Sequence, residues 1–343
     1  MILSALAVSL SVQTQAVAQD KVLNIYSARH YQTDEVMYDT FTRTTGIKIN
    51  RVDADDAGIV ARLRAEGAAS PADVILLVDA ARMASGDSLG LFQPIKSAKL
   101  DAAIPANLRA SPTAEGVTWT GFSTRARVII YDPLRAKAAD VATYEQLATP
   151  QLKGLVCTRS GSHPYNLSLF ATVVERLGDA KGEAWLKGLV DNMARAPKGG
   201  DTDQIKAVAS GECGVALSNT YYVARLMKST KPEDRAVMEK VRIVFPNQGT
   251  SGTHVNIAGA AVAKHAKNRD NAIQFMEFLA SPFAQDHFAN GNNEFPVVKG
   301  LKTPNPAIEA MGGANFKAEN IPLAVVAKNM TKVQQMLDRV GYK

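Results

Sequence analysis

Four tyrosines stand where predicted strands end and predicted helices begin, out of only nine in the 343-residue chain. They are Tyr31, after a strand at 22–27, Tyr165, after a strand at 155–161, and Tyr221 and Tyr222, after a strand at 214–219. Ligands of open α/β sheets bind at the carboxyl ends of the strands, where loops lead into helices. The positions of the four phenols therefore predict that they share one site.

Phenol oxygens at such a site favour a hard, highly charged cation. The deprotonated oxygen is a hard anionic ligand, but a free tyrosine has a pKa near ~10. A trivalent metal favours the deprotonated form directly, and the free N–H groups of helix N-termini also favour negative charge. Tyr221 and Tyr222 would point about 100° apart inside a helix, but in its first turn both reach one ion beyond the helix end.

Four phenolates carry more negative charge than one 3+ ion neutralises. Arg225 lies four residues after Tyr221 on the predicted helix 220–229, so it is placed to offset part of the excess. The residue types and their spacing thus predict a trivalent metal site with an arginine beside it.

The elements that must position these tyrosines alternate between strand and helix. The first set comprises strands at 22–27, 47–53 and 72–79, with helices at 33–46 and 57–67 between them. This order implies parallel strands with right-handed crossovers in an open α/β sheet. The loop "YSARHYQTD" after the first strand has no glycine, which argues against a dinucleotide site.

A second alternating set follows the long predicted strand at 124–133. It comprises strands at 155–161, 214–219 and 241–248 and helices at 166–178, 183–193, 202–213 and 220–229. We expect two lobes joined by extended crossovers near 121–127 and 244–250, which act as hinges. The predicted division assigns 19–124 and 247–300 to the N-terminal lobe, and 125–246 and 301–343 to the C-terminal lobe.

The composition, with 46% apolar and 21% charged residues, is that of a soluble globular protein. Residues 1–18 read as a signal peptide cleaved after Ala18, although no Lys or Arg precedes the apolar stretch; a buried N-terminal helix is the alternative. The net charge of +6 comes from scattered Lys and Arg, so no nucleic-acid partner is expected.

The chain has two cysteines, Cys157 and Cys213. An even number in an exported chain permits one disulfide. If the strands that lead to Tyr165 and Tyr221 pair in parallel, they bring the two cysteines together; two buried thiols are the alternative. No Cys/His cluster has the spacing of a zinc site.

An enzyme is not expected. Ser160, Ser162 and His163 lie close in sequence, but no G-x-S-x-G turn surrounds them and no acidic partner is evident. A binding protein for another small ligand, an anion or a polyamine, remains the alternative function. His254, in an apolar run, is expected to be structural, and Asp79, after a strand end, is expected to cap the next helix.

The segments "RHY", "SHPYN", "SNTYY" and "TRAR" resemble those of the periplasmic ferric-ion-binding proteins, which capture iron for bacterial ATP-binding-cassette importers. The resemblance also covers "GLFQPIKS" and "NNEFPVV", and so nearly the whole mature chain. It implies a two-lobed α/β periplasmic binding protein fold with the ligand in the interlobe cleft. It also implies a periplasmic monomer that works with an importer permease in the inner membrane.

The resemblance also implies a site. The residues it assigns as metal ligands are His30, Tyr31, Tyr165, Tyr221 and Tyr222, with Arg125 and Arg225 as charges beside them. Fe(3+) would be the transported ligand, and an anion beside the iron is compatible with this ligand set but not required by it.

Overall fold

The computed structural model describes residues 21–29 and 31–343. The predicted signal peptide and His30 lie outside these residues. The strands form one sheet system with the order β2-β1-β3-β9-β5-β7-β6, and β4, β8 and β10 pair with its central strands. The strands are β1 (Val22–Ser27), β2 (Lys48–Asp53), β3 (Val74–Leu77), β4 (Phe92–Gln93), β5 (Trp119–Tyr131), β6 (Val156–Cys157), β7 (Val215–Asn219), β8 (Arg242–Val244), β9 (Val255–Ala263) and β10 (Phe295–Pro296).

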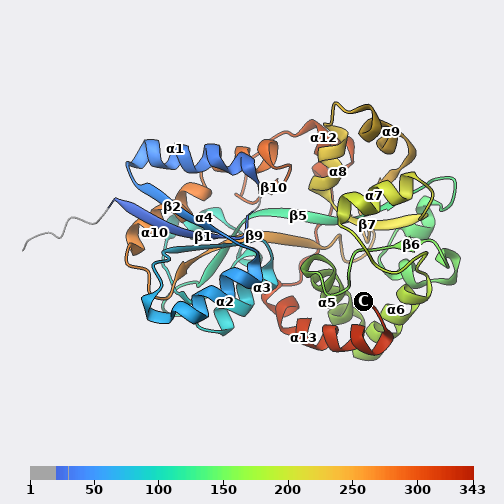
Figure 1. Ribbon diagram of the computed structural model, residues 1–343, viewed down its shortest axis with the longest axis horizontal. Helices are drawn as coiled ribbons and strands as arrows, with labels where there is room; N and C mark the ends of the chain where they lie inside the picture. Colours follow the sequence, from blue (N-terminus) through green and yellow to red (C-terminus); the bar gives the residue numbers. More distant parts are fainter. Residues whose placement is uncertain (1–20, 30) are drawn as a thin grey trace, which may run out of the picture.

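Helices cover both faces of the sheet (Figure 1). They are α1 (Glu35–Thr45), α2 (Asp56–Glu66), α3 (Ala80–Ser88), α4 (Ala98–Ala103), α5 (Pro164–Leu177), α6 (Asp179–Asp191), α7 (Asp201–Ala209), α8 (Thr220–Met227), α9 (Pro232–Lys240), α10 (Arg269–Leu279), α11 (Pro282–Asp286), α12 (Pro306–Ala310) and α13 (Leu323–Val340). No helix among the residues described is both long enough and apolar enough to cross a membrane.

The first three strands pair as predicted. β1 lies parallel to β2 on one side and to β3 on the other. The four residues of β3 are all buried, as expected for a β-branched and leucine-rich strand covered on both faces. Gly46, with φ 74°, ends α1 at the predicted residue. Thr33 does not cap that helix, because its hydroxyl bonds to Asn292 instead.

Two long antiparallel strands, β5 and β9, run side by side through the middle of the molecule (Figure 1). β5 is buried along its whole length and starts five residues before the predicted strand at 124. The second crossover was expected near 244–250, but that segment is a turn in which Asn247 has φ 61°. Pro246 before it has no N–H to donate to a sheet, and the crossing strand β9 starts only at Val255.

The buried apolar side chains divide into clusters at the two ends of these crossing strands. One cluster contains Trp119 and Phe122 of β5 with the residues of β1, β3 and α10. Two others contain the far end of β5, such as Ile129 and Ile130, with the residues of β7 and α5. Hereafter the first cluster defines the first half of the molecule and the other two define the second half. The predicted lobe boundaries remain a prediction.

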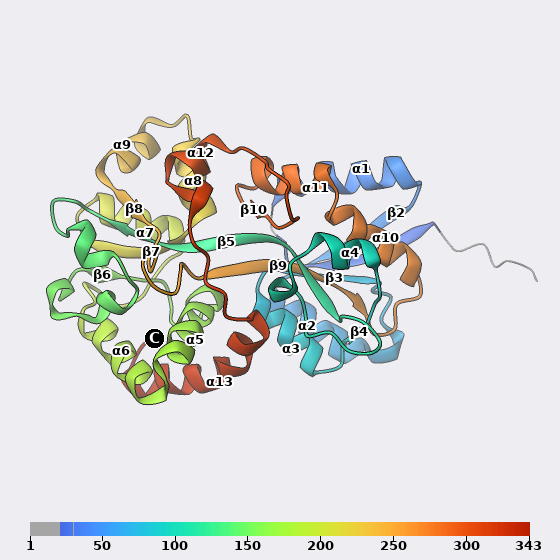
Figure 2. The ribbon, with the colours of Figure 1, turned by 180° about the vertical axis from the view of Figure 1, so that it is seen from behind.

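The C-terminal helix α13 spans the junction of the halves. Leu323, at its start, belongs to the core of the first half. Val326, Val333, Met336 and Leu337 belong to that of the second half. Figure 2 shows α13 with α3 beside one end and with α5 and α6 towards the other. This helix therefore packs against both halves at once.

The predicted disulfide is confirmed. β6 and β7 pair in parallel with Cys157 opposite Ala216, and Cys157 is bonded to Cys213 with their Cα atoms 5.8 Å apart. Both side chains are fully buried. β6 is much shorter than predicted, since only Val156 and Cys157 pair, and the remainder of 155–161 forms the loop that leads to α5.

Candidate metal-binding site

The four predicted tyrosines lie together. The Tyr221 hydroxyl donates to the Tyr165 hydroxyl over 3.1 Å. The Tyr31 ring lies edge-on to the Tyr221 ring with centroids 6.0 Å apart, and the Tyr221 and Tyr222 rings lie 4.3 Å apart. Tyr31 comes from the loop after β1, in the first half, whereas the other three come from α5 and α8 in the second. The fifth predicted ligand, His30, lies outside the described residues.

The start of α5 places Tyr165. His163 is the residue before the helix, and its Nδ1 accepts a hydrogen bond from the Tyr165 backbone N–H over 3.2 Å. Pro164 occupies the first helical position, where its fixed φ suits a helix and its missing N–H costs nothing. The His163 ring also packs on the Tyr165 ring at 4.5 Å. Burial and the nearby Arg159 lower the pKa of His163 to about 3, so this ring is neutral.

A single buried arginine fixes both ligand-bearing helices of the second half. Arg127 donates to Asn166 of α5 over 2.8 Å and to Asn219, directly before α8, over 3.1 Å. It also forms an ion pair with Asp201, which is fully buried and accepts from the Asn219 backbone N–H over 2.8 Å. The sequence analysis missed this role. Arg127 stands two residues after Arg125 on β5, where alternate residues share one face.

Four arginines lie against the rings of these tyrosines, and Arg29 is one of them, 5.0 Å from the Tyr31 ring centroid. Arg125 is buried, with its guanidinium carbon 5.3 Å from the Tyr165 ring centroid. Arg225 lies 5.5 Å from the Tyr222 ring centroid. Both were singled out from the sequence, but Arg159, which lies 5.2 Å from the Tyr165 ring centroid, was not. The cluster thus carries positive charge on several sides.

Tyr31 has a buried acidic neighbour. Its hydroxyl donates to Oε1 of Glu294 over 3.3 Å, while Ser123 of β5 donates to Oε2 over 2.9 Å. Arg29 pairs with the same carboxylate at 3.2 Å and with Asp34 at 2.6 Å. Glu294 lies in the segment "NNEFPVV", but nothing in the sequence pattern indicated that it would meet Tyr31.

Burial favours the protonated form of Tyr31, Tyr165 and Tyr221 in the metal-free cluster. It raises the pKa of Tyr165 to about 12, against the opposing effect of Arg125. Burial also raises the pKa of Tyr31 and of Tyr221 well above the usual value, and the neighbouring carboxylate or phenols add to the rise. A bound cation would reverse this balance, because it stabilises the phenolate form.

The tyrosines face a cleft of about 630 Å³. Tyr31, Tyr165 and Tyr222 line it, and Tyr221 lies fully buried beneath them. No group of three or more His, Cys, Asp or Glu residues suited to a metal ion occurs in the described chain. The phenol cluster is therefore the candidate metal site.

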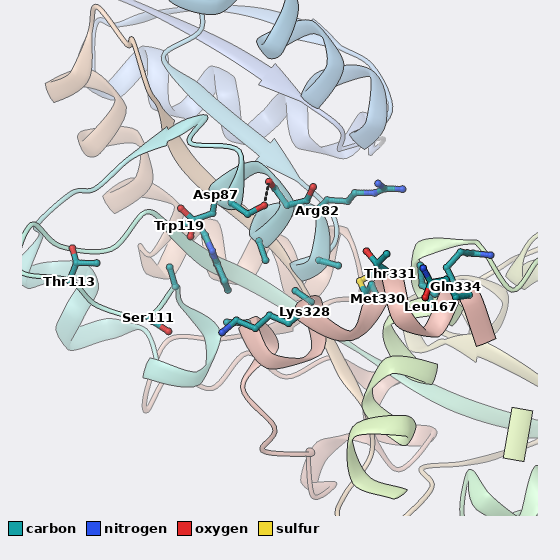
Figure 3. Close-up of a pocket in the computed structure, with 18 residues that line it drawn as sticks. Arg82, Asp87, Ser111, Thr113, Trp119, Leu167, Lys328, Met330, Thr331 and Gln334 are labelled. Atoms are coloured by element: carbon teal, nitrogen blue, oxygen red, sulfur yellow. Dashed lines mark hydrogen bonds between the residues drawn. The ribbon is translucent and has the colours of Figure 1, made fainter. Parts of the chain in front are cut away.

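A larger hollow of about 880 Å³ lies elsewhere, between α3 and α13. Figure 3 shows Trp119 and Lys328 on one side of it and Leu167, Met330 and Gln334 on the other. Among the residues that line it, only Asp87 carries a carboxylate. This hollow, hereafter the rear groove, lacks the set of hard oxygen ligands that the cleft provides.

The other predicted residues have contacts of their own. His254 is buried, and its Nδ1 lies 3.1 Å from the Thr172 hydroxyl. Its backbone N–H donates to the Tyr144 hydroxyl over 3.1 Å. These contacts fit the expected structural role. Asp79 caps α3 as expected, since its side chain accepts from the Ala81 N–H over 2.8 Å.

This chain is similar to known proteins over nearly its whole length. A model of bacterial extracellular solute-binding proteins matches residues 36–313. Iron uptake protein A2 of Synechocystis sp. is 43% identical over 343 residues, which cover 99% of this chain and 95% of that protein. A Trichodesmium protein solved in complex with iron and citrate ligands has a TM-score of 0.87 and 46% identity, covering 94% of this chain and 100% of that one. A ferric binding protein from Campylobacter jejuni has a TM-score of 0.86 and 37% identity, with coverage of 94% and 100%.

Proposed function

Because the chain belongs to the bacterial extracellular solute-binding protein family, we propose that it binds ferric iron through tyrosine phenolates and delivers it to an ATP-binding-cassette importer. The observation that carries the proposal is the meeting of four tyrosines from two halves of the molecule, with the hydroxyls of Tyr165 and Tyr221 3.1 Å apart. Phenolate oxygen suits a hard trivalent cation. The relatives, which are named for iron uptake and ferric iron binding, support the same ligand.

The family and the fold agree with the sequence-based expectations. The chain has the mixed α/β fold of the periplasmic binding proteins, as its similarity to the solved structures demonstrates. It is a solute-binding protein and not an enzyme.

In the proposed site, Tyr31, Tyr165, Tyr221 and Tyr222 supply four phenolate ligands. His30, carried over from the family resemblance, is the proposed fifth. Arg125 and Arg225 offset the negative charge that exceeds that of the ion, and Arg159 adds to them from the other side of Tyr165. A small anion such as citrate, present with iron in the Trichodesmium structure, has room in the cleft but is not needed to complete the ligand set.

Export and handover complete the proposal. The predicted signal peptide would place the mature chain outside the cytoplasm, cleaved after Ala18. The two halves, with the proposed boundaries near 124 and 247, would close over the ion, and the permease of the importer would receive it from a monomer.

The test is the visible absorption spectrum with and without ferric citrate. Tyrosinate–iron(III) charge transfer should give the wild type an orange to red colour. Tyr222→Phe deletes one oxygen and little volume, so it should shift the band and weaken binding. Tyr131→Phe is the matched control, because Tyr131 is a buried tyrosine on β5 outside the cluster. A colourless wild type at saturating ferric citrate would refute phenolate ligation, and an unchanged Tyr222→Phe would remove that residue from the ligand set.

A further inference from the structure

Asp79 does more than cap a helix. Its fully buried carboxylate accepts hydrogen bonds from three different elements. The Ala81 N–H of α3 donates over 2.8 Å, and the Asn256 side chain of β9 donates over 2.8 Å. The Ser168 hydroxyl of α5 donates to both carboxylate oxygens, at 3.2 and 3.0 Å.

The bond between Asp79 and Ser168 joins the two halves of the molecule. Asp79 stands between Leu77 and Ala80, which belong to the core of the first half. Ser168 precedes Leu169, which belongs to the core of the second half. Both side chains are buried, so the bond forms where water does not compete with it.

This bond reaches the tyrosine cluster through α5. Ser168 is three residues after Tyr165, and residues at this spacing lie on the same face of a helix. A contact that holds Ser168 against the first half therefore also fixes how far Tyr165 lies from that half. Tyr31, the described cleft tyrosine of the first half, lines the same cleft as Tyr165.

Arg125 supplies a second route from Asp79 to Tyr165. Its Nη2 lies 3.9 Å from Oδ2 of Asp79, and the same atom donates to the carbonyl of Val78. The guanidinium packs over the Tyr165 ring. The Asp79 carboxylate is thus paired with the β5 arginine that packs over the Tyr165 ring.

The segments that carry this contact also line the two hollows. Val78 and Tyr165 line the tyrosine cleft, whereas Ala81 and Leu167 line the rear groove shown in Figure 3. Asp79 lies between Val78 and Ala81 in the sequence, and Ser168 directly follows Leu167. The hydrogen bond between Asp79 and Ser168 therefore joins two segments that each reach both hollows.

We propose that Asp79 and Ser168 are positioning residues that hold Tyr165 at the correct distance from Tyr31 and so set the affinity for the metal without touching it. This inference rests on the proposed function. A hydrogen bond to a charged, buried group is among the stronger kinds. Its loss should therefore raise the dissociation constant for iron by about tenfold or more.

Ser168→Ala tests the proposal, since alanine keeps the helix. It leaves Asp79 with its hydrogen bonds to Ala81 and Asn256 and its ion pair with Arg125. Ser162→Ala is the matched control, because that hydroxyl bonds only within its loop, to Ser160 over 2.9 Å. The measurements are iron affinity against nitrilotriacetate, the rate of iron loss to a chelator, the charge-transfer spectrum and the unfolding midpoint of the metal-free protein.

The expected result is a dissociation constant raised about tenfold through faster iron loss, with the band position unchanged and the metal-free midpoint close to that of the wild type. Asp79→Asn should weaken binding in the same direction, because its amide cannot accept at both positions. An affinity within twofold of wild type in Ser168→Ala would overturn the inference while leaving the proposed function intact. A shifted band would also overturn it, since Ser168 would then act on the ligand set itself. A wild type that binds no iron would overturn both.

Discussion

Replacing both Cys157 and Cys213 by alanine should destabilise the second half of the molecule and leave the first half nearly unchanged. The disulfide is buried among apolar side chains of the second half. It links β6 to the turn before β7, and these are the segments that lead to Tyr165 and to Tyr221. Alanine is chosen because it leaves no polar group in this apolar environment.

The size of the effect follows from the loop that the bridge closes. The two cysteines are 56 residues apart in sequence. In the loop-entropy model, a cross-link of this length lowers the free energy of the folded state relative to the unfolded state by about 4 kcal/mol. The removal of two buried sulfur atoms adds a packing loss, which the loop term does not include.

Urea unfolding monitored by tyrosine and tryptophan fluorescence measures this change. Wild-type protein in reductant is the matched control, because it keeps both sulfur atoms and loses only the cross-link. The reduced wild type should show an unfolding free energy lowered by about 4 kcal/mol. The double variant should lose more than that, because it also carries the packing loss. If the halves unfold in separate transitions, only one transition should move.

Two outcomes would refute this reasoning. Two titratable thiols in the unfolded, unreduced wild type would show that the bridge is absent in solution. An unfolding free energy within about 1 kcal/mol of the oxidised wild type in both the double variant and the reduced protein would show that the loop term does not govern stability.

Three further predictions concern the cleft and its surroundings. Because burial raises the pKa of Tyr31, Tyr165 and Tyr221, iron binding should release at least three protons. The apparent association constant for iron should therefore fall about a thousandfold for each pH unit of acidification below neutrality. A competition titration corrected for protonation of the chelator measures this dependence, and a tenfold fall per pH unit would contradict it. Solution scattering should show contraction of the wild type on iron binding and less contraction in Tyr31→Phe, since Tyr31 is the described cleft tyrosine of the first half; equal contraction in both would argue that Tyr31 does not draw the halves together. Burial lowers the pKa of His254 to about 3, from about 6.5 in the unfolded chain, so this ring stabilises the folded state fully above pH 6.5 and loses that contribution as the pH falls towards 3. His254→Gln should remove about 1.4 kcal/mol per pH unit from the acid dependence of unfolding in that window, and parallel curves for the variant and the wild type would refute the assignment.

The sequence was sufficient for the features that depend on local pattern. The tyrosines could be placed at strand ends because β-branched runs and helix starts are visible in a single sequence. The disulfide followed once two strands were expected to pair in parallel. The second crossover was misplaced because the apolar run at 241–248 reads as a continuous strand, although Pro246 and Asn247 turn the chain out of the sheet.

The features that were missed depend on contacts between residues far apart in the chain. Arg127 holds α5 and α8 through Asn166 and Asn219. An asparagine near the start of a helix is common, so neither residue suggested a buried arginine as its partner. Glu294 meets Tyr31 from 263 residues away. No periodicity reports such a pairing, because it is decided by which elements pack together and not by the pattern within either one.

The buried Arg127 implies an order in which the proposed ligands would bind and release the ion. It joins α5 and α8 to one guanidinium, so in the proposed site Tyr165, Tyr221 and Tyr222 would move together. An arriving ion would meet these three phenols first and gain Tyr31 only in a second, slower step. Departure would run in reverse, so a receptor that pulls the loop after β1 away would loosen the ion before disturbing the other three ligands. Release would thus begin on the Tyr31 side of the cleft, because the other three phenols are held together through Arg127 and Tyr31 is not.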